Sequence, residues 1–298
     1  MLRREFLQLS GLATASLALP SWAPSVATMQ VGYAAITWGG NDPAAIDDVS
    51  AAGYAGIQLR ASAVKRWEQT PEVLRALLAE KRLAFPVLSS GGVPFADAAA
   101  RDSFAMHVAN ARFAKAAGGR YLQVVDERPR GGTPEAPDYA RMGRLLTELG
   151  TRVADEGITL VYHNHMGALG EHPTEVARIL DATDAKAVQV LLDTAHWQAA
   201  GGNPVEAVKQ YAPRIAVVHL KDLEQPLPNG SATSYRFREL GAGRVPIPQV
   251  IEALNKIGFA GWGIVELDGV PVPNTAPKLY AEQSKRYLES LGVRVSTR

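Results

Sequence analysis

The chain has 298 residues, of which 47% are hydrophobic and 20% are charged, a composition typical of a globular protein with enough apolar residues for a large core. Its 31 basic and 30 acidic residues give a net charge of +1 and form no basic stripe, so nucleic acid is not expected as a partner. The chain has no cysteine, which excludes disulfide bonds, thiolate catalysis and cysteine-based zinc or iron–sulfur sites.

The N-terminus has the features of an export signal. Paired Arg3 and Arg4 are followed by Glu-Phe-Leu, a weakly apolar run over residues 7–19, and small residues at 25–27. This pattern resembles a twin-arginine signal, in which R-R-x-F-L precedes a weak hydrophobic region. Because the apolar run is too short to span a membrane, we expect residues 1–27 to direct export to the periplasm without a stable membrane anchor. An ordinary N-terminal helix or an uncleaved anchor is the alternative.

Eight short apolar runs, rich in β-branched residues, follow the N-terminal segment. Such nearly continuous apolar runs are typical of parallel strands that are buried on both faces. In chain order they cover residues 30–37, 56–60, 83–89, 121–126, 158–163, 188–193, 215–220 and 262–267.

Amphipathic segments with helix-capping residues separate these runs. Thr70 and Pro71 form a good start for one helix, and Gly53 ends another. The predicted helices cover residues 43–53, 70–81, 138–157, 203–213, 246–258 and 276–292. Strands and helices alternate without a linker, which predicts that residues 28–298 form a single (β/α)₈ TIM barrel, an α/β fold. An open doubly wound sheet is less favoured, because no Gly-rich phosphate loop follows the first strand.

Polar residues stand where the last four predicted strands end. They are His163, Asp193, His219 and Glu266, separated by 30, 26 and 47 residues, so each falls on a new strand. In a TIM barrel these ends meet at the face that carries the active site. Two imidazoles and two carboxylates suit a divalent transition metal and balance its charge. We expect manganese, with cobalt, zinc, magnesium and iron as alternatives.

Four motifs make a family resemblance specific. They are LVYHNHMG at 160–167, LLDTAHW at 191–197, VVHLKD at 217–222 and GWGIVELD at 261–268. These motifs resemble the sugar phosphate isomerase/epimerase superfamily, which has a xylose-isomerase-like barrel. They resemble inosose dehydratases in particular, whose fifth strand also ends in a Y-H-x-H-M-G run. The resemblance implies a metal bound by His163, Asp193, His219 and Glu266, with Asn164 as a less favoured ligand.

The resemblance also implies a reaction. Enzymes of this superfamily remove a proton next to a carbonyl, and the metal stabilises the resulting enediolate. Epimerases usually have glutamate where this chain has His163, and Gln58 replaces another frequent glutamate. One remaining glutamate base, Glu266, suits β-elimination from a keto sugar or cyclitol, as in an inosose dehydratase or a keto-glycoside lyase. The alternatives are a sugar isomerase or epimerase, a non-catalytic exported sugar-binding barrel, and a metal-dependent endonuclease; the last requires a basic face that this chain lacks.

Further residues are candidates for proton transfer and substrate binding. His165, His196 and Lys221 are expected to transfer protons or to hold substrate oxygens, together with Glu266 as ligand and base. For Lys221 the alternative is an ion pair with a neighbour such as Asp222.

The substrate is expected to be a small sugar or cyclitol, with oligomerisation left open. Arg60 and Trp197 are the candidate substrate-binding residues, and a surface ion pair is the alternative for Arg60. The long irregular segment 226–247 is a candidate lid over the mouth of the barrel.

Overall fold

The computed structural model describes residues 29–228, 230–231 and 233–295. The predicted export signal therefore lies outside the described residues and stays a prediction. Within the described part of the chain, no helix combines the length and apolar character needed to cross a bilayer.

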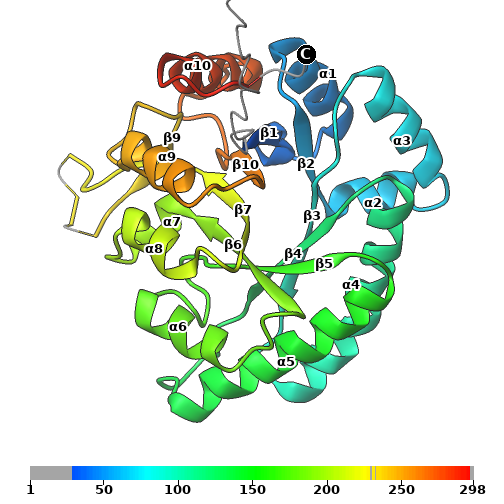
Figure 1. Ribbon diagram of the computed structural model, residues 1–298, viewed down its shortest axis with the longest axis vertical. Helices are drawn as coiled ribbons and strands as arrows, with labels where there is room; N and C mark the ends of the chain where they lie inside the picture. Colours follow the sequence, from blue (N-terminus) through cyan, green and yellow to red (C-terminus); the bar gives the residue numbers. More distant parts are fainter. Residues whose placement is uncertain (1–28, 229, 232, 296–298) are drawn as a thin grey trace, which may run out of the picture.

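Eight parallel strands close into a barrel, and helices surround it (Figure 1). The strand order is β1-β10-β7-β6-β5-β4-β3-β2, so β10 pairs with both β7 and β1 and closes the sheet. The predicted TIM-barrel fold is confirmed. The barrel strands are β1 (Gln30–Ala34), β2 (Gly56–Arg60), β3 (Val87–Val93), β4 (Tyr121–Asp126), β5 (Thr159–His163), β6 (Val188–Asp193), β7 (Ile215–Leu220) and β10 (Trp262–Val265).

The helices lie on the outside of the barrel, and a short 3-10 helix, η1 (Ala35–Trp38), follows β1. They are α1 (Asp42–Ala52), α2 (Ala61–Trp67), α3 (Pro71–Glu80), α4 (Asp97–Ala116), α5 (Ala136–Asp155), α6 (Pro173–Asp181), α7 (Thr194–Ala199), α8 (Pro204–Tyr211), α9 (Ile247–Lys256) and α10 (Pro277–Ser290). All six helices expected from the sequence are present, with ends that differ by at most two residues. The structure adds α2, α4, α6 and α7, which were not predicted individually.

The third strand differs most from its prediction. It runs from Val87 to Val93 rather than over residues 83–89. Pro86 has no N–H to donate to a neighbouring strand, so the segment before it contributes only an isolated bridge between Gly56 and Ala84. The strand instead continues through a bulge between Ser89 and Gly92, where its register against β4 shifts.

A two-stranded antiparallel hairpin lies outside the barrel. Its strands are β8 (Asp222–Glu224) and β9 (Arg236–Arg238), and both belong to the long segment after β7. The segment expected to form a lid, residues 226–247, contains β9 but not β8.

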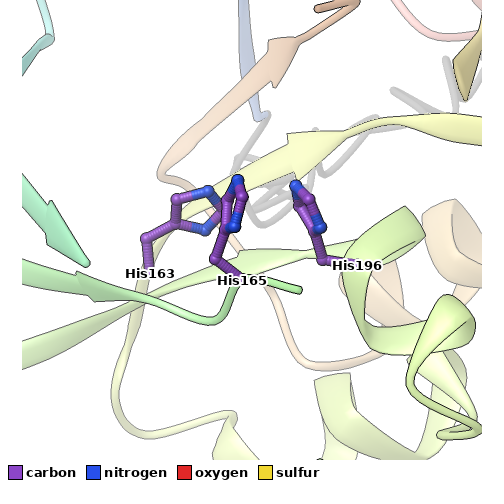
Figure 2. A group of neighbouring side chains, drawn as sticks. All are labelled: His163, His165 and His196. Carbon is purple, nitrogen blue, oxygen red and sulfur yellow. The ribbon is translucent and has the colours of Figure 1, made fainter. Parts of the chain in front are cut away.

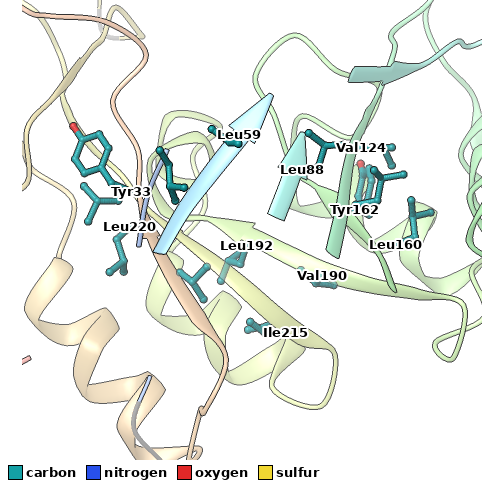
Figure 3. Close-up of a cluster of buried hydrophobic side chains, with 14 of the residues drawn as sticks. Tyr33, Leu59, Leu88, Val124, Leu160, Tyr162, Val190, Leu192, Ile215 and Leu220 are labelled. Atoms are coloured by element: carbon teal, nitrogen blue, oxygen red, sulfur yellow. The ribbon is translucent and has the colours of Figure 1, made fainter. Parts of the chain in front are cut away.

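Two apolar layers hold the barrel together. Side chains that point outward from the strands, such as Leu59, Leu88 and Leu192, pack against the helices (Figure 3). Side chains that point inward, such as Val161 and Ile264, fill the barrel interior. Successive strand residues alternate between these two layers. The inward-facing side chain that follows the last apolar residue of the inner layer therefore faces the mouth of the barrel.

Candidate active site

All four predicted metal ligands continue the inward-facing rows of their strands. Each lies two residues after an apolar side chain of the inner layer and therefore points to the same side of the sheet. The pairs are Val161 and His163, Leu191 and Asp193, Val217 and His219, and Ile264 and Glu266. The apolar layer thus forms a floor beneath the four polar side chains.

The four side chains converge at one point. One donor atom from each of His163, Asp193, His219 and Glu266 lies within 4.8 Å of the others, and all four residues are buried. The Nδ1 atom of His219 is 3.4 Å from Oδ2 of Asp193 and 3.5 Å from Oε2 of Glu266. The structure therefore brings together the set that the sequence placed on four strand ends.

This set fits a divalent cation. The Nδ1 atoms of His163 and His219 and the Oδ2 atom of Asp193 are buried without a hydrogen-bond partner among the described residues. Buried polar atoms normally form hydrogen bonds. Three such atoms without hydrogen-bond partners around one point therefore mark a place where a cation can bind. Imidazole and carboxylate donors suit zinc, manganese, iron or cobalt.

Gln58 fixes the orientation of His219. The Nε2 atom of Gln58 donates to Oε1 of Gln123 at 2.8 Å, so its own Oε1 faces Nε2 of His219 at 3.0 Å. The imidazole therefore carries its proton on Nε2 and keeps a lone pair on Nδ1, which points at the cluster. Gln58, noted in the sequence as a departure from the family pattern, thus supports a ligand.

Asp193 is divided between two roles. Its Oδ1 atom caps α7 by accepting from the backbone N–H groups of Ala195 and His196 at 2.9 and 2.8 Å. Its Oδ2 atom remains free for the cluster. The amide of Asn164 bonds to both the N–H and the carbonyl of Asp193, so Asn164 positions the ligand rather than joining the set.

Lys221 lies beside the cluster and pairs with two carboxylates. Its Nζ atom is 2.9 Å from Oε1 of Glu266 and 2.6 Å from Oδ1 of Asp268, and its side chain is fully buried. The expected alternative, an ion pair with a neighbour, is therefore formed, but its partners are Glu266 and Asp268. Asp222, named as an example of such a neighbour, bonds to backbone N–H groups instead. Three carboxylates and one ammonium leave the cluster with an excess negative charge that a divalent cation would neutralise.

The local charges favour the forms that bind a cation. Burial, followed by the nearby His219, lowers the pKa of His163 well below its ordinary value, so this imidazole is neutral. Burial opposes the ionisation of Asp193, but His196 and Lys221 hold its pKa well below the usual range. Burial also opposes the charge on Lys221, yet Glu266, Asp193 and Asp268 raise its pKa and keep it an ammonium.

Three histidines form a second, overlapping cluster (Figure 2). His163, His165 and His196 also bring donor nitrogens within 4.8 Å of one another, and the rings of His165 and His196 lie side by side with centroids 3.9 Å apart. However, Nε2 of His196 is 3.2 Å from the Lys221 ammonium, which disfavours a second cation there. His165 lines the cavity beside the cluster and is therefore better placed to contact a substrate than to bind a metal. His196 is buried, and its Nδ1 atom accepts from the N–H of Met166 at 3.2 Å, so it supports the site from behind instead of reaching the cavity.

A cavity opens above the cluster. Arg60, His163, His165, Glu266 and Asp268 are among its lining residues. Arg60 forms no salt bridge among the described residues, which supports its prediction as a substrate contact over the alternative of a surface ion pair.

Trp197 does not reach this cavity. Its side chain is buried in the core and packs edge-on against Tyr211, with ring centroids 5.8 Å apart. Consecutive residues of a helix point about 100° apart, so His196 faces the cluster while Trp197 faces the surrounding helices. The prediction that Trp197 contacts the substrate is therefore wrong.

Two residues at the site were not predicted. Asp268 lies two residues after Glu266, and the strand alternation that links His163 to His165 was the signal that could have revealed it. Phe237 comes from the hairpin and packs over Lys221, whose Nζ is 4.0 Å from the ring centroid. The hairpin therefore covers Lys221 on one side of the cluster, while the prediction of a lid over the mouth of the barrel stays a prediction.

A family model agrees with this fold. Residues 46–291 match the family described as xylose isomerase-like TIM barrel. The chain belongs to this family. The predicted superfamily and the prediction that the chain is an enzyme are thereby confirmed.

Individual relatives align with most of this chain. The rhizopine catabolism protein MocC of Rhizobium meliloti is 29% identical and covers 92% of this chain and 93% of its own. An inosose dehydratase of Lacticaseibacillus casei is 25% identical and covers 88% of this chain and 97% of its own. Among solved structures, the IolI protein with a bound zinc atom superposes with a TM-score of 0.76 at 18% identity, over 91% of this chain and 100% of its own.

Proposed function

We propose that this protein is a divalent-metal-dependent enzyme that removes a proton next to the carbonyl of a keto sugar or cyclitol, with β-elimination as the outcome. The observation that carries the proposal is the convergence of His163, Asp193, His219 and Glu266, with unsatisfied donor atoms, at the floor of a cavity. The similarity to an inosose dehydratase and the zinc in the IolI structure support this chemistry.

The residues of the site have distinct tasks in this proposal. A bound cation would stabilise the negative charge that develops on the substrate oxygens. Glu266 lines the cavity and accepts the proton, while Lys221 holds the Oε1 atom of this carboxylate in place. His165 lines the cavity and holds a hydroxyl group of the substrate, while His196 lies behind it next to Lys221. Arg60, at the end of β2, binds a further oxygen at the outer wall.

The identity of residue 163 favours elimination over epimerisation. Epimerisation by two opposed bases needs a carboxylate on each side of the substrate, and this chain has an imidazole with a lowered pKa at the first position. A single carboxylate at Glu266 removes a proton from one face only. The charge that develops can then be relieved by loss of a β-substituent. A sugar isomerase or epimerase of the same superfamily is the second candidate.

Product analysis tests the proposal. Metal-loaded protein is incubated in deuterated water with an inosose and with 3-keto sugars, and the products are identified by NMR. We expect an unsaturated elimination product, and a Glu266→Gln variant that retains metal should be slower by at least ~10²-fold. Clean interconversion of two epimers, without an elimination product, would reject the lyase and favour the isomerase.

A further inference from the structure

The cavity above the metal centre continues into a second space, here called the outer lobe. The outer lobe lies between the loops that follow β4 and β5, and it is lined by residues 125–128 and 165–168. Val125 and His165 line both the cavity and the outer lobe, so the two spaces adjoin. The outer lobe is more open to solvent than the cavity at the metal centre, so a group bound there would lie in a groove at the mouth of the barrel.

The walls of the outer lobe are fixed to each other. Arg128, from the loop after β4, donates through Nε to the carbonyl of Ala168 at 2.8 Å and through Nη2 to Oε2 of Glu175 at 3.1 Å. Tyr139 donates to the other oxygen of Glu175 at 2.9 Å. Because these bonds join the loop after β4 to the loop after β5 and to α6, the space between them is part of the folded structure.

The outer lobe has the surface of a sugar-binding site. Asp126 is 2% exposed, and its Oδ2 atom accepts from the N–H of Gly170 at 2.8 Å. Its carboxyl group is buried next to the Tyr162 hydroxyl, so Asp126 supports the wall of the outer lobe from behind. The side chain of Glu127 adds an exposed carboxylate and Met166 adds apolar surface. Hydroxyl acceptors beside an apolar surface match the two kinds of surface of a sugar ring.

From this continuity we infer that the outer lobe binds a second, hydroxyl-bearing ring of the substrate, and that the substrate is a keto-glycoside rather than a free inosose. This inference rests on the proposed function and specifies its substrate class. The keto sugar ring lies over the metal centre, and the ring attached through the glycosidic oxygen lies between the two loops.

The corresponding reaction is balanced without an oxidant or a reductant. In a 3-keto-glycoside the proton at C2, next to the carbonyl, is removed. A double bond forms between C1 and C2, and the bond from C1 to the glycosidic oxygen breaks. The departing oxygen takes up one proton, which balances the proton lost from C2. The products are an unsaturated keto sugar and the free alcohol of the second ring.

Substrates that differ only in the second group test the inference. The metal-loaded protein is given an inosose, a methyl 3-keto-glucoside and a glucosyl 3-keto-glucoside, and kcat/KM is measured for each. Remote contacts that bind the second ring should raise kcat/KM by at least about tenfold from the methyl to the glucosyl compound. An inosose turned over as efficiently as the glucosyl compound would overturn the inference.

Two variants locate the effect in the outer lobe. Met166→Trp fills the space, and it keeps the backbone N–H of residue 166 that contacts Nδ1 of His196 at 3.2 Å. Glu127→Gln keeps the size of the side chain and removes the charge of the exposed carboxylate, and it provides the test if Met166→Trp does not fold. Either variant should reduce the preference for the glucosyl over the methyl compound. As a control, Leu279→Trp on the exposed side of α10 should leave that preference unchanged.

The outcomes separate this inference from the proposed function. If no keto sugar is turned over by metal-loaded protein, both are overturned. If keto sugars are eliminated but the second ring brings no advantage, or if both variants keep the full preference, only the outer-lobe inference is overturned.

Discussion

At the scale of single residues, three of the four candidate metal ligands have a neighbour that decides which of their atoms is free. Gln58 accepts a hydrogen bond from Nε2 of His219. Backbone N–H groups of α7 donate to Oδ1 of Asp193, and Lys221 donates to Oε1 of Glu266. The remaining atom of each ligand then points at the cluster. These neighbours make the geometry of the site a property of several elements rather than of four side chains.

Gln58 offers a direct test of this arrangement. In a Gln58→Ala variant, Nε2 of His219 loses its acceptor, so the tautomer and the ring orientation are no longer fixed. We expect metal affinity to fall by about 10- to 100-fold, the usual cost of losing a residue that orients a ligand. The affinity is measured by competition with a chromophoric chelator. Gln189→Ala, which changes a glutamine at the opposite end of the barrel, should have no effect.

Asp126 makes folding stability depend on pH. Burial raises the pKa of Asp126 to about 6 from an ordinary value of 3.8, so the folded state favours the protonated carboxyl. The stabilisation that comes from the protonated carboxyl is fully present below the pKa of the unfolded chain, 3.8, and is lost as pH rises through the folded pKa of about 6. Between pH 4 and pH 7 the stability of the natural protein should therefore fall by about 2 kcal/mol relative to Asp126→Asn. Denaturant unfolding of both proteins measures this difference, and a difference that is constant with pH would contradict the shifted pKa.

At the scale of elements, the hairpin of β8 and β9 depends on one buried side chain. Asp222 accepts hydrogen bonds from the backbone N–H groups of Leu223, Gly241, Gly243 and Val245 at 2.8 to 3.0 Å. The same hairpin places Phe237 over Lys221. Asp222 therefore links the loop that follows β9 to the strand end that carries Lys221.

Removing this side chain should loosen the cover of the site. We expect Asp222→Ala to lower the free energy of unfolding by about 3 kcal/mol, because several buried N–H groups lose a charged acceptor. Hydrogen exchange of the amides of residues 240–245 should also become faster. Glu252→Ala, which removes one exposed ion pair with Lys256, is the control and should not change the melting temperature measurably. An Asp222→Ala protein as stable as the control would contradict this role.

The same scale shows what the sequence could predict. The ligands His163, Asp193, His219 and Glu266 were predictable because parallel strands bring their carboxyl ends to one edge, and each stood at such an end. The prediction that Trp197 contacts the substrate was wrong because Trp197 lies on a helix, where neighbouring residues face different directions. Phe237 could not be predicted, since its position depends on contacts of an irregular segment with the barrel. The start of β3 was misplaced because its apolar residues begin before Pro86, which has no N–H to donate to a neighbouring strand.

At the scale of the whole molecule, the proposed metal centre would join half of the barrel. The four ligands come from β5, β6 and β7 and from the segment that directly follows β10, so a bound cation links neighbouring strands that the unfolded chain does not hold together. Binding to the folded state alone stabilises it by about 2.7 kcal/mol when the metal is at 100 times its Kd. The export signal predicted for residues 1–27 stays a prediction.

Metal removal should therefore lower thermal stability. Treatment with a chelator is expected to reduce the Tm by roughly 5 to 10 °C, the scale that this energy gives for a domain of this size. Restoring the metal should restore the Tm. A His163→Ala variant lacks one ligand, so its Tm should respond little to metal or to chelator. Equal responses of the two proteins would show that the cation binds elsewhere.

The most direct test of the central claim is anomalous diffraction from crystals grown with manganese and measured near the manganese absorption edge. The account predicts one strong peak at about 2.0 to 2.3 Å from a donor atom of each of His163, Asp193, His219 and Glu266. Absence of a peak at this position, or a peak bound by His165 and His196 instead, would contradict it.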